Sequence, residues 1–307
     1  MFRLNLATAF YLLSATFLWA GNAIAGRVLV GSISPITLSM VRWSLAALLL
    51  APLGWRVFKP KSALWQNKGR LLILGLLGVG SYNALLYLAL QTSTAINVTL
   101  IGASMPIWSL FIGAFFFQAK PRFLQMIGAV ISILGVVLVL TRGDFARLLT
   151  LEVVVGDLFI MLATIMWALY SWMISRPGKS TEREWPWAEF LMAQVVFGCL
   201  WTGLFYDVEF AAGYAFINLD FWGWLIILFI AVGPSLIAYR FWGIGVTRAG
   251  PTVASFFANL IPLFTALLSA ALLGDPPRLF HGLAFILIVT GIVISSIQAK
   301  KQPIPLN

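Results

Sequence analysis

The chain has 307 residues, of which 61% are hydrophobic and 10% are charged, against roughly 25% charged in a soluble domain. So few charges cannot cover the surface of a soluble protein of this length. The formal net charge of +10 is spread over short segments between apolar blocks and forms no basic stripe, so we expect a membrane protein with no nucleic-acid partner.

Ten apolar blocks of about 20 residues follow one another, each long enough to cross ~30 Å of hydrocarbon as a helix. The predicted spans are residues 6–30, 35–53, 70–90, 94–118, 122–141, 154–174, 187–206, 221–243, 250–273 and 279–297. Residues 23–25 form an A-x-A sequence that resembles a signal-peptide cleavage site. The repeat described below needs this first segment, so we expect it to remain as a span.

Lys and Arg are distributed unevenly over the loops. Ten spans place both termini on one side, and the segments on that side contain Arg3, Arg56, Lys59, Lys61, Lys68, Arg70, Lys120, Arg122, Arg176, Lys179, Arg183, Arg248, Lys300 and Lys301. The opposite segments contain only Arg27, Arg142, Arg147 and Arg278. Because cytoplasmic loops are enriched in basic residues, this predicts cytoplasmic termini in a cell (inner) membrane.

The two halves of the chain carry matching residues at regular spacing. Leu18-Trp19-Ala20 and Met166-Trp167-Ala168 are 148 positions apart. Later matches, at a shift of 156, are Pro106 with Pro262, Pro121 with Pro277, Arg122 with Arg278 and Gly135 with Gly291. Five spans per half insert the second copy in the opposite direction. The predicted fold is an all-α integral membrane protein of ten transmembrane helices in two inverted five-helix repeats, residues 1–148 and 149–307.

Two stretches resemble the EamA-type repeat of the drug/metabolite transporter superfamily. They are residues 80–106, with Tyr87, Ala89-Leu90, Thr94-Ala95 and a mid-helix proline, and residues 156–170, with Gly156-Asp157-Leu158 and Trp167-Ala168-Leu169-Tyr170. The resemblance covers about residues 8–298. It implies a central cavity lined by helices 1, 3, 4, 6, 8 and 9, and export of amino acids, other small metabolites or drugs. In overall character the chain is similar to the aromatic amino acid exporter branch.

Polar and aromatic residues on those six helices are the candidate substrate-binding residues. They are Trp19, Asn22, Tyr82, Asn83, Tyr87, Asn97, Thr99, Trp167, Tyr170, Tyr239, Arg240, Ser255 and Asn259. A polar group facing lipid is costly, so each faces either a neighbouring helix or the cavity. Pro106 and Pro262 interrupt helices 4 and 9, where they act either as structural kinks or as hinges.

Two arginines, Arg42 and Arg240, fall inside predicted spans. An arginine at mid-membrane costs roughly 2.5–3.5 kcal/mol on translocon scales, so it normally faces protein or water. Each is either a structural cation or an attractor for a substrate carboxylate, and Arg240, on a cavity helix, is the better placed for the second role. All ten acidic residues map to loops or span ends, which disfavours proton-driven extrusion of cations.

The sequence contains no set of residues suited to catalysis or metal binding. A single cysteine, Cys199, and a single histidine, His281, offer neither a disulfide nor a metal cluster, and no G-x-x-x-x-G-K-[ST] loop occurs. We therefore expect a transporter, not an enzyme, that acts as a monomer in the lipid bilayer without cofactor or metal. Its predicted cargo is an amino-acid-like small molecule, bulky or aromatic. The alternatives are a multidrug or lipophilic-cation exporter and, in a different class, a membrane-embedded binding protein or enzyme.

Overall fold

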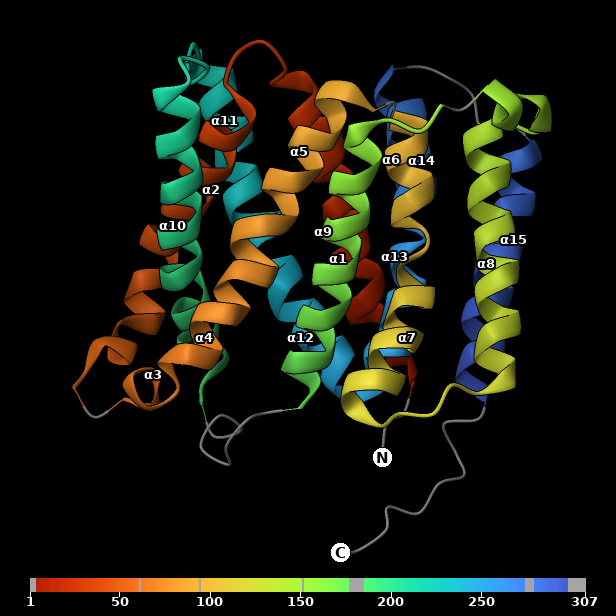
Figure 1. Ribbon diagram of the computed structural model, residues 1–307, viewed down its shortest axis with the longest axis horizontal. Coiled ribbons are helices and arrows are strands. Elements are labelled where there is room, and N and C mark those ends of the chain that lie inside the picture. The colour runs from red at the N-terminus through yellow and green to blue at the C-terminus, as the bar shows by residue number, and fades with distance from the viewer. Residues whose placement is uncertain are drawn as a thin grey trace, which may run out of the picture.

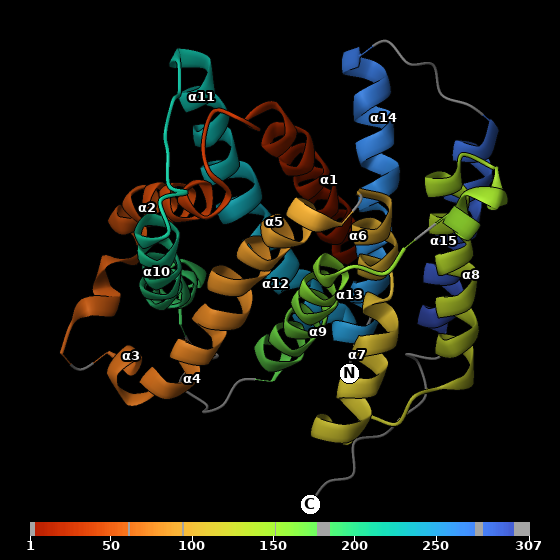
Figure 2. The same ribbon diagram turned by 45° about the horizontal axis from the view of Figure 1, so that its top comes forward.

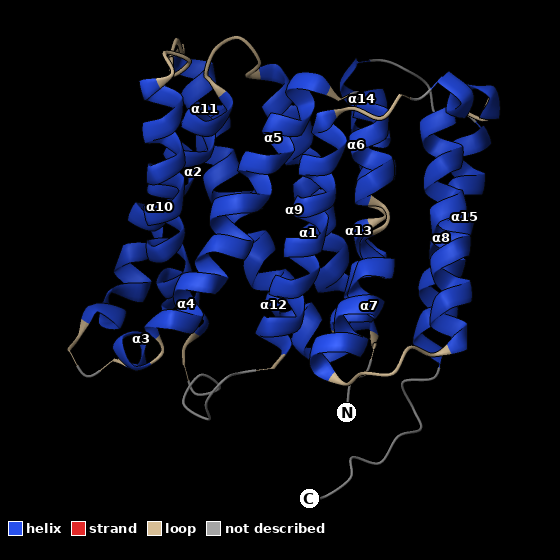
Figure 3. Cartoon of the chain, viewed as in Figure 1, coloured by secondary structure: helices blue, strands red, loops and turns tan. Residues whose placement is uncertain are grey.

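The computed structural model describes residues 4–60, 62–93, 95–150, 152–176, 185–273 and 279–297. Helices and short loops account for these residues (Figure 3). Ten helical stretches among them are long and apolar enough to cross a membrane, as predicted. Residues named above that lie outside the described ones are Arg3, Lys61, Thr94, Lys179, Arg183, Pro277, Arg278, Lys300 and Lys301, and three of the ten acidic residues, Glu182, Glu184 and Asp275, lie outside them too.

The spans of the first half are α1, α2, α4 to α5, α6 to α7, and α8. Their bounds are α1 (Leu6–Val28), α2 (Pro35–Gly54) with η1 (Trp55–Phe58), α4 (Lys68–Leu74) and α5 (Tyr82–Thr92) joined by η2 (Gly75–Ser81), α6 (Ala95–Gly102) with α7 (Met105–Phe117), and α8 (Phe123–Thr141). Two short elements, α3 (Ala63–Gln66) and η3 (Phe145–Thr150), lie between spans.

The second half repeats this order. Its bounds are α9 (Val155–Ser175), α10 (Trp187–Ala211), α11 (Phe221–Ile230) and α12 (Ala238–Ala249) joined by η5 (Ala231–Ile237), α13 (Pro251–Ala258) with α14 (Ile261–Leu273), and α15 (Leu279–Ser296). The chain enters α1 and leaves α15 at the same end of the bundle, which we call the terminal end (Figure 1).

The eighth span is longer than predicted. We expected it to end at Gly243, but α12 continues to Ala249. A helical glycine costs only about 1 kcal/mol relative to alanine, so Gly243 alone does not end a helix. Gly250 does, because its φ of 87° lies in the left-handed region that favours glycine. There the chain turns from α12 into α13.

The last spans of the two halves, α8 and α15, form a close pair at one side of the bundle (Figures 1 and 2). A Cβ atom on Gly128 would lie 2.7 Å from the carbonyl oxygen of Gly291, and one on Gly291 would lie 2.6 Å from that of Gly128. Only glycine permits this approach. Small residues of this kind allow helices to associate in a membrane, where the hydrophobic effect contributes little.

Both halves interrupt the same two spans at equivalent positions. The π-helical segments η2 and η5 begin at Gly75 and Ala231, which are 156 positions apart. The breaks between α6 and α7 and between α13 and α14, at residues 103–104 and 259–260, have the same shift, and Pro106 and Pro262 follow them. Figure 3 shows such a break as a loop inside a span. The backbone thus confirms the two inverted repeats, and π-helical segments often mark functional sites.

Glu209, near the end of α10, caps the N-terminus of α2. Its carboxylate accepts hydrogen bonds from the backbone N–H groups of Ile36 (3.0 Å) and Thr37 (2.9 Å) and from the Thr37 hydroxyl (2.7 Å). The first N–H groups of a helix lack intrahelical partners, and the helix dipole favours an anion there. Glu209 therefore ties α10 to α2 at the end opposite the terminal end.

Replacing Glu209 by alanine should lower the free energy of unfolding by roughly 1.5–3 kcal/mol, the value of hydrogen bonds to a charged group. Thermal unfolding of the purified protein in detergent measures the change. The control is Asp207→Ala, because Asp207 lies on the same helix but is exposed. This control should shift stability by no more than about 0.5 kcal/mol. Equal shifts in the two variants would contradict the role of Glu209.

Candidate functional site

Seven aromatic side chains from both halves meet in the middle of the bundle. This aromatic cluster consists of Trp19 (α1), Trp43 (α2), Tyr82 (α5), Trp167 and Tyr170 (α9), and Tyr239 and Trp242 (α12). The ring centroids of Trp19 and Trp167 are 5.2 Å apart at an interplanar angle of 86°, and those of Trp43 and Tyr239 are 5.0 Å apart at 84°. These edge-to-face contacts are the geometry that aromatic pairs prefer.

The π-helical segments hold the rings of the cluster in place. The Tyr239 hydroxyl donates a hydrogen bond to the carbonyl oxygen of Gly78 in η2. The Trp19 indole N–H donates to the carbonyl oxygen of Pro234 in η5, at 3.1 Å. Gly78 and Pro234 are again 156 positions apart, and each accepts from a ring of the opposite half. Each repeat therefore positions an aromatic ring of the other through a hydrogen bond to an equivalent backbone carbonyl group.

A polar cluster of four residues borders the rings. Arg42, on α2, is 1% exposed, and its guanidinium donates from Nε and Nη2 to the Ser235 hydroxyl at 3.1 and 2.9 Å. Its Nη1 donates to the amide oxygens of Asn83 at 3.0 Å and Asn22 at 3.4 Å. Arg42 thus contacts three other spans, through α1, α5 and η5.

The polar cluster is continuous with the aromatic cluster along each helix. Asn22 follows Trp19 by three positions, so the two share a face of α1. Asn83 is next to Tyr82, and Ser235 precedes Tyr239 by four. The guanidinium carbon of Arg42 lies 5.2 Å from the ring centroid of Trp43. One end of the site is therefore cationic and polar, and the other is aromatic.

The charge of Arg42 is compensated only by neutral groups. Among the described residues, no carboxylate oxygen lies within 4.0 Å of its guanidinium, and the ion pair found there joins Arg147 to Asp144 in an exposed loop. Moving an ion out of water costs several kcal/mol even after relaxation. Such a charge inside a membrane span is uncommon and marks a candidate functional site.

The two clusters are covered on the side of the terminal end. All eight residues of α13 are buried there, and Phe256 and Phe257 belong to the same apolar core as Trp167 and Trp242. By contrast, Trp19, Asn22 and Tyr82 are only half-buried. Asn22 lies one helical turn beyond Trp19 toward the opposite end. The exposed edge of the site therefore faces away from the terminal end.

Several predicted site residues lie elsewhere. The Asn97 amide donates to the Asp157 carboxylate (3.2 Å) and to the Glu152 carbonyl, where α6 meets the start of α9. The Asn259 amide donates to the Ser132 hydroxyl on α8 at 2.9 Å. Both contacts join neighbouring helices. Three further predicted residues belong to neither cluster. Ser255 donates a hydrogen bond to the carbonyl oxygen of Thr252, and Tyr87 and Thr99 are half-buried.

Of the two arginines inside predicted spans, Arg42 lies at the site, and Arg240, which we ranked first, does not. Arg240 is exposed, and its guanidinium carbon stacks 4.2 Å from the ring centroid of Trp187 at the start of α10. Its long side chain can thus leave the bundle and keep its charge at the membrane edge. Arg42, ranked second from the sequence, lies in the middle of the bundle.

The sequence reasoning missed Trp43, Ser235 and Trp242. Helix 2 was not among the expected cavity helices, although a mid-span Arg42-Trp43 pair was a signal that it contributes to the site. Ser235 lies in a Gly-Pro-Ser sequence whose proline suggests an irregular backbone. Trp242 follows Tyr239 by three positions and therefore shares its helix face. Its indole N–H donates to the Ser171 hydroxyl at 3.1 Å.

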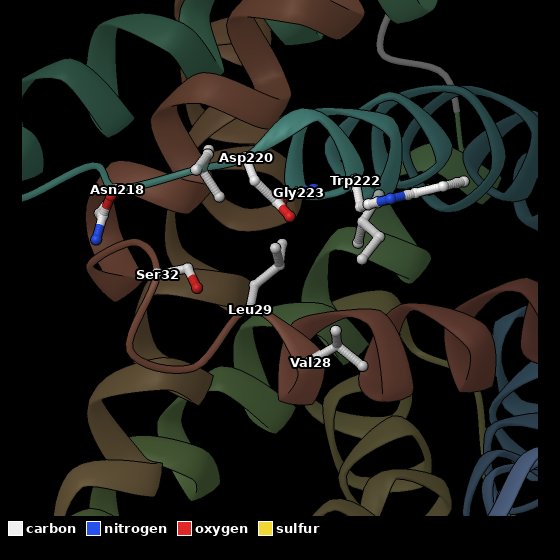
Figure 4. A pocket seen from close by; sticks show the side chains of 9 residues that line it. Val28, Leu29, Ser32, Asn218, Asp220, Trp222 and Gly223 are labelled. Atoms are coloured by element: carbon white, nitrogen blue, oxygen red, sulfur yellow. Dashed lines mark hydrogen bonds between the residues drawn. The ribbon is translucent and has the colours of Figure 1, made fainter.

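A pocket of about 540 Å³ lies apart from these clusters, where α1 ends and α11 begins (Figure 4). Its lining includes Val28, nine residues beyond Trp19 and so roughly 13 Å further along α1. Asp220, its acidic residue, accepts a hydrogen bond from the Gly223 N–H at 2.7 Å and so caps α11. That helix-capping role accounts for the carboxylate.

Comparisons with known proteins agree with this architecture. The EamA-like transporter family matches residues 6–141 and again residues 154–297. The chain is 26% identical to the uncharacterized transporter YyaM of Bacillus subtilis, over 87% of this chain and 86% of that one. It is 23% identical to the aromatic amino acid exporter YddG of Ancylobacter novellus, over 94% and 96% of the two chains. A solved crystal structure superposes with a TM-score of 0.76 at 19% identity, covering 96% and 99% of the chains.

Gly78→Ala should disturb the aromatic cluster, because the added Cβ would lie 2.6–2.9 Å from ring atoms of Tyr170. Overpacking of this kind typically costs roughly 1–3 kcal/mol. We expect a lower melting temperature and altered near-ultraviolet circular dichroism. Gly243→Ala is the matched control, since nothing lies within 4 Å of its added Cβ. If both variants melt like the wild type, the rings are not packed as described.

Proposed function

The chain belongs to the EamA-like transporter family, and from this we propose that it exports bulky amino acids, above all aromatic ones, through the site formed by the aromatic and polar clusters. The observation that carries the proposal is the meeting of seven aromatic rings from both repeats at one mid-membrane site. Transporters built from inverted repeats bind substrate near the midplane between the repeats.

The rings suit a flat apolar side chain. Trp167 is 4% exposed and contacts Trp19 across the boundary between the halves, so a substrate ring enters only when the two halves move apart. Its stacking on Trp or Tyr would then replace the ring–ring contacts of the closed site. The similarity to an aromatic amino acid exporter over nearly the full length of both chains supports this choice of cargo.

The same site is poorly suited to lipophilic cations. Among the described residues, no carboxylate borders the aromatic cluster, and the charged group that does, Arg42, is itself a cation. A cation entering the site would meet a like charge in a medium that screens it weakly. This argues for neutral or zwitterionic cargo over the multidrug alternative.

Alternating access gives the backbone irregularities a role. The breaks before Pro106 and Pro262 lie at equivalent positions of the two repeats. A helix interrupted by proline bends at lower cost than an intact one. We propose that these breaks act as hinges that open the site first on one side and then on the other. The protein works as a monomer in the inner membrane, with cytoplasmic termini, and binds a small amino-acid-like substrate.

Counterflow in proteoliposomes tests the cargo. With a panel of labelled amino acids, we expect exchange of tryptophan, phenylalanine and tyrosine to exceed that of glycine and lysine. Trp19→Ala should reduce this exchange without preventing insertion, because Trp19 is half-buried at the edge of the site. The control is Trp222→Ala, since Trp222 is 68% exposed and lies outside both clusters. Resistance of expressing cells to quaternary-ammonium dyes, but not to toxic amino-acid analogues, would overturn the proposed cargo.

Cysteine labelling tests the orientation. In a Cys199→Ala background, Lys59→Cys should resist an impermeant thiol reagent added outside intact cells, and Ala146→Cys should react. Both positions are exposed at opposite ends of the bundle, so the difference reports the side of the membrane. Because basic loops favour the cytoplasm, Lys59 is expected inside. Labelling of position 59 together with protection of position 146 would show that the orientation is opposite to the one proposed.

A further inference from the structure

We propose that Arg42 binds the carboxylate of the substrate and that Asn22 and Asn83 then accept its ammonium group, which makes the site selective for zwitterions. This inference rests on the proposed function and specifies how the site recognises its substrate. At the border of the aromatic cluster, a buried guanidinium without an acidic partner among the described residues donates hydrogen bonds to two amide oxygens.

Arg42 carries a buried positive charge. A guanidinium and a carboxylate form strong, often bidentate hydrogen bonds, so a carboxylate is the group that best compensates the charge of a buried arginine. The bundle supplies only amide and hydroxyl oxygens to Arg42 from the described residues. These neutral acceptors keep the guanidinium hydrogen-bonded, but they leave its net charge in place. A substrate carboxylate would remove that charge from the membrane interior.

A substrate carboxylate displaces the amide oxygens of two asparagines from Arg42. Arg42 holds Asn22 and Asn83 through the same nitrogen, Nη1, and the bond to Asn22 is long, at 3.4 Å. Asn22 is half-buried, so a ligand reaches this side of the guanidinium first. When a carboxylate takes Nη1, both amide oxygens lose their donor. They then lie close to each other, to the carboxylate and to any group attached to it.

The ammonium group of the substrate replaces Arg42 as the donor to these amide oxygens. In an α-amino acid it is separated from the carboxylate by one carbon atom, and it donates three hydrogen bonds. The two released oxygens of Asn22 and Asn83 are acceptors without donors, and leaving a buried acceptor unsatisfied is costly. An ammonium group bound there satisfies them. The substrate side chain then points along α1 and α5 toward Trp19, one helical turn from Asn22, and Tyr82, which precedes Asn83.

Binding of matched ligands to the purified protein tests this assignment. The probes are tryptophan and tryptamine, which lacks the carboxylate. The wild type should prefer tryptophan, and Arg42→Gln should weaken tryptophan binding by roughly 10–100-fold, the value of a hydrogen bond to a charged group. Tryptamine binding should change less than about threefold. Arg240→Gln, which alters the exposed arginine, is the control and should leave both affinities unchanged.

A second variant keeps the test decisive if Arg42→Gln fails to fold. Asn83→Asp preserves the shape of the side chain and places a carboxylate at hydrogen-bond distance from Arg42. This internal partner should retain or raise the melting temperature and abolish the preference for tryptophan over tryptamine. Equal losses for both ligands in either variant would show that Arg42 acts only as a structural residue. A wild type that binds no amino acid in the panel would instead refute the proposed function itself.

Discussion

A guanidinium buried in an apolar bundle must find hydrogen-bond acceptors, and this requirement organises the centre of the protein. Arg42 obtains them from α1, α5 and η5, so four spans are fixed relative to one another around one side chain. Each partner lies within about one helical turn of a ring residue of the aromatic cluster on the same span. Positioning Asn22, Asn83 and Ser235 for Arg42 therefore also positions Trp19, Tyr82 and Tyr239. The polar and the aromatic parts of the site are held by a common set of contacts.

The inverted repeat supplies a symmetric frame, and the side chains break the symmetry. η2 and η5 match at a shift of 156, yet the positions equivalent to Asn83 and Ser235 are Tyr239 and Val79. On α10, which corresponds to α2, Gln194 accepts a hydrogen bond from the Tyr170 hydroxyl at 2.8 Å, and Tyr170 is 148 positions past Asn22. The contact between α1 and α2 is thus repeated with uncharged partners. One repeat provides the cationic end, and the other provides most of the aromatic end.

The sequence was sufficient for features that depend on composition and order along the chain. The number of spans, the repeat and the equivalence of Trp19 and Trp167 within it follow from the spacing and type of residues, and five predicted aromatic residues do meet. Rotation of a span about its own axis was not predictable, because a helix that is apolar all round has no clear inward face. Arg42 was ranked below Arg240 for a different reason: helix 2 was not among the expected cavity helices. Asn97 and Asn259 could not be distinguished in advance from site residues, since an amide that joins two helices and one that faces a substrate have the same sequence pattern.

The neutrality of the groups around Arg42 has a consequence for transport. An internal carboxylate would form a strong ion pair with the guanidinium, and a substrate carboxylate would have to break that pair before binding. Amide and hydroxyl oxygens hold the guanidinium less strongly, so an incoming carboxylate exchanges with them at lower cost. A transporter must also release its cargo, and tight binding slows release. When the substrate leaves, Asn22 and Asn83 can rebond Arg42 and so lower the cost of emptying the site. Neutral partners therefore suit a site that must bind and release in every cycle.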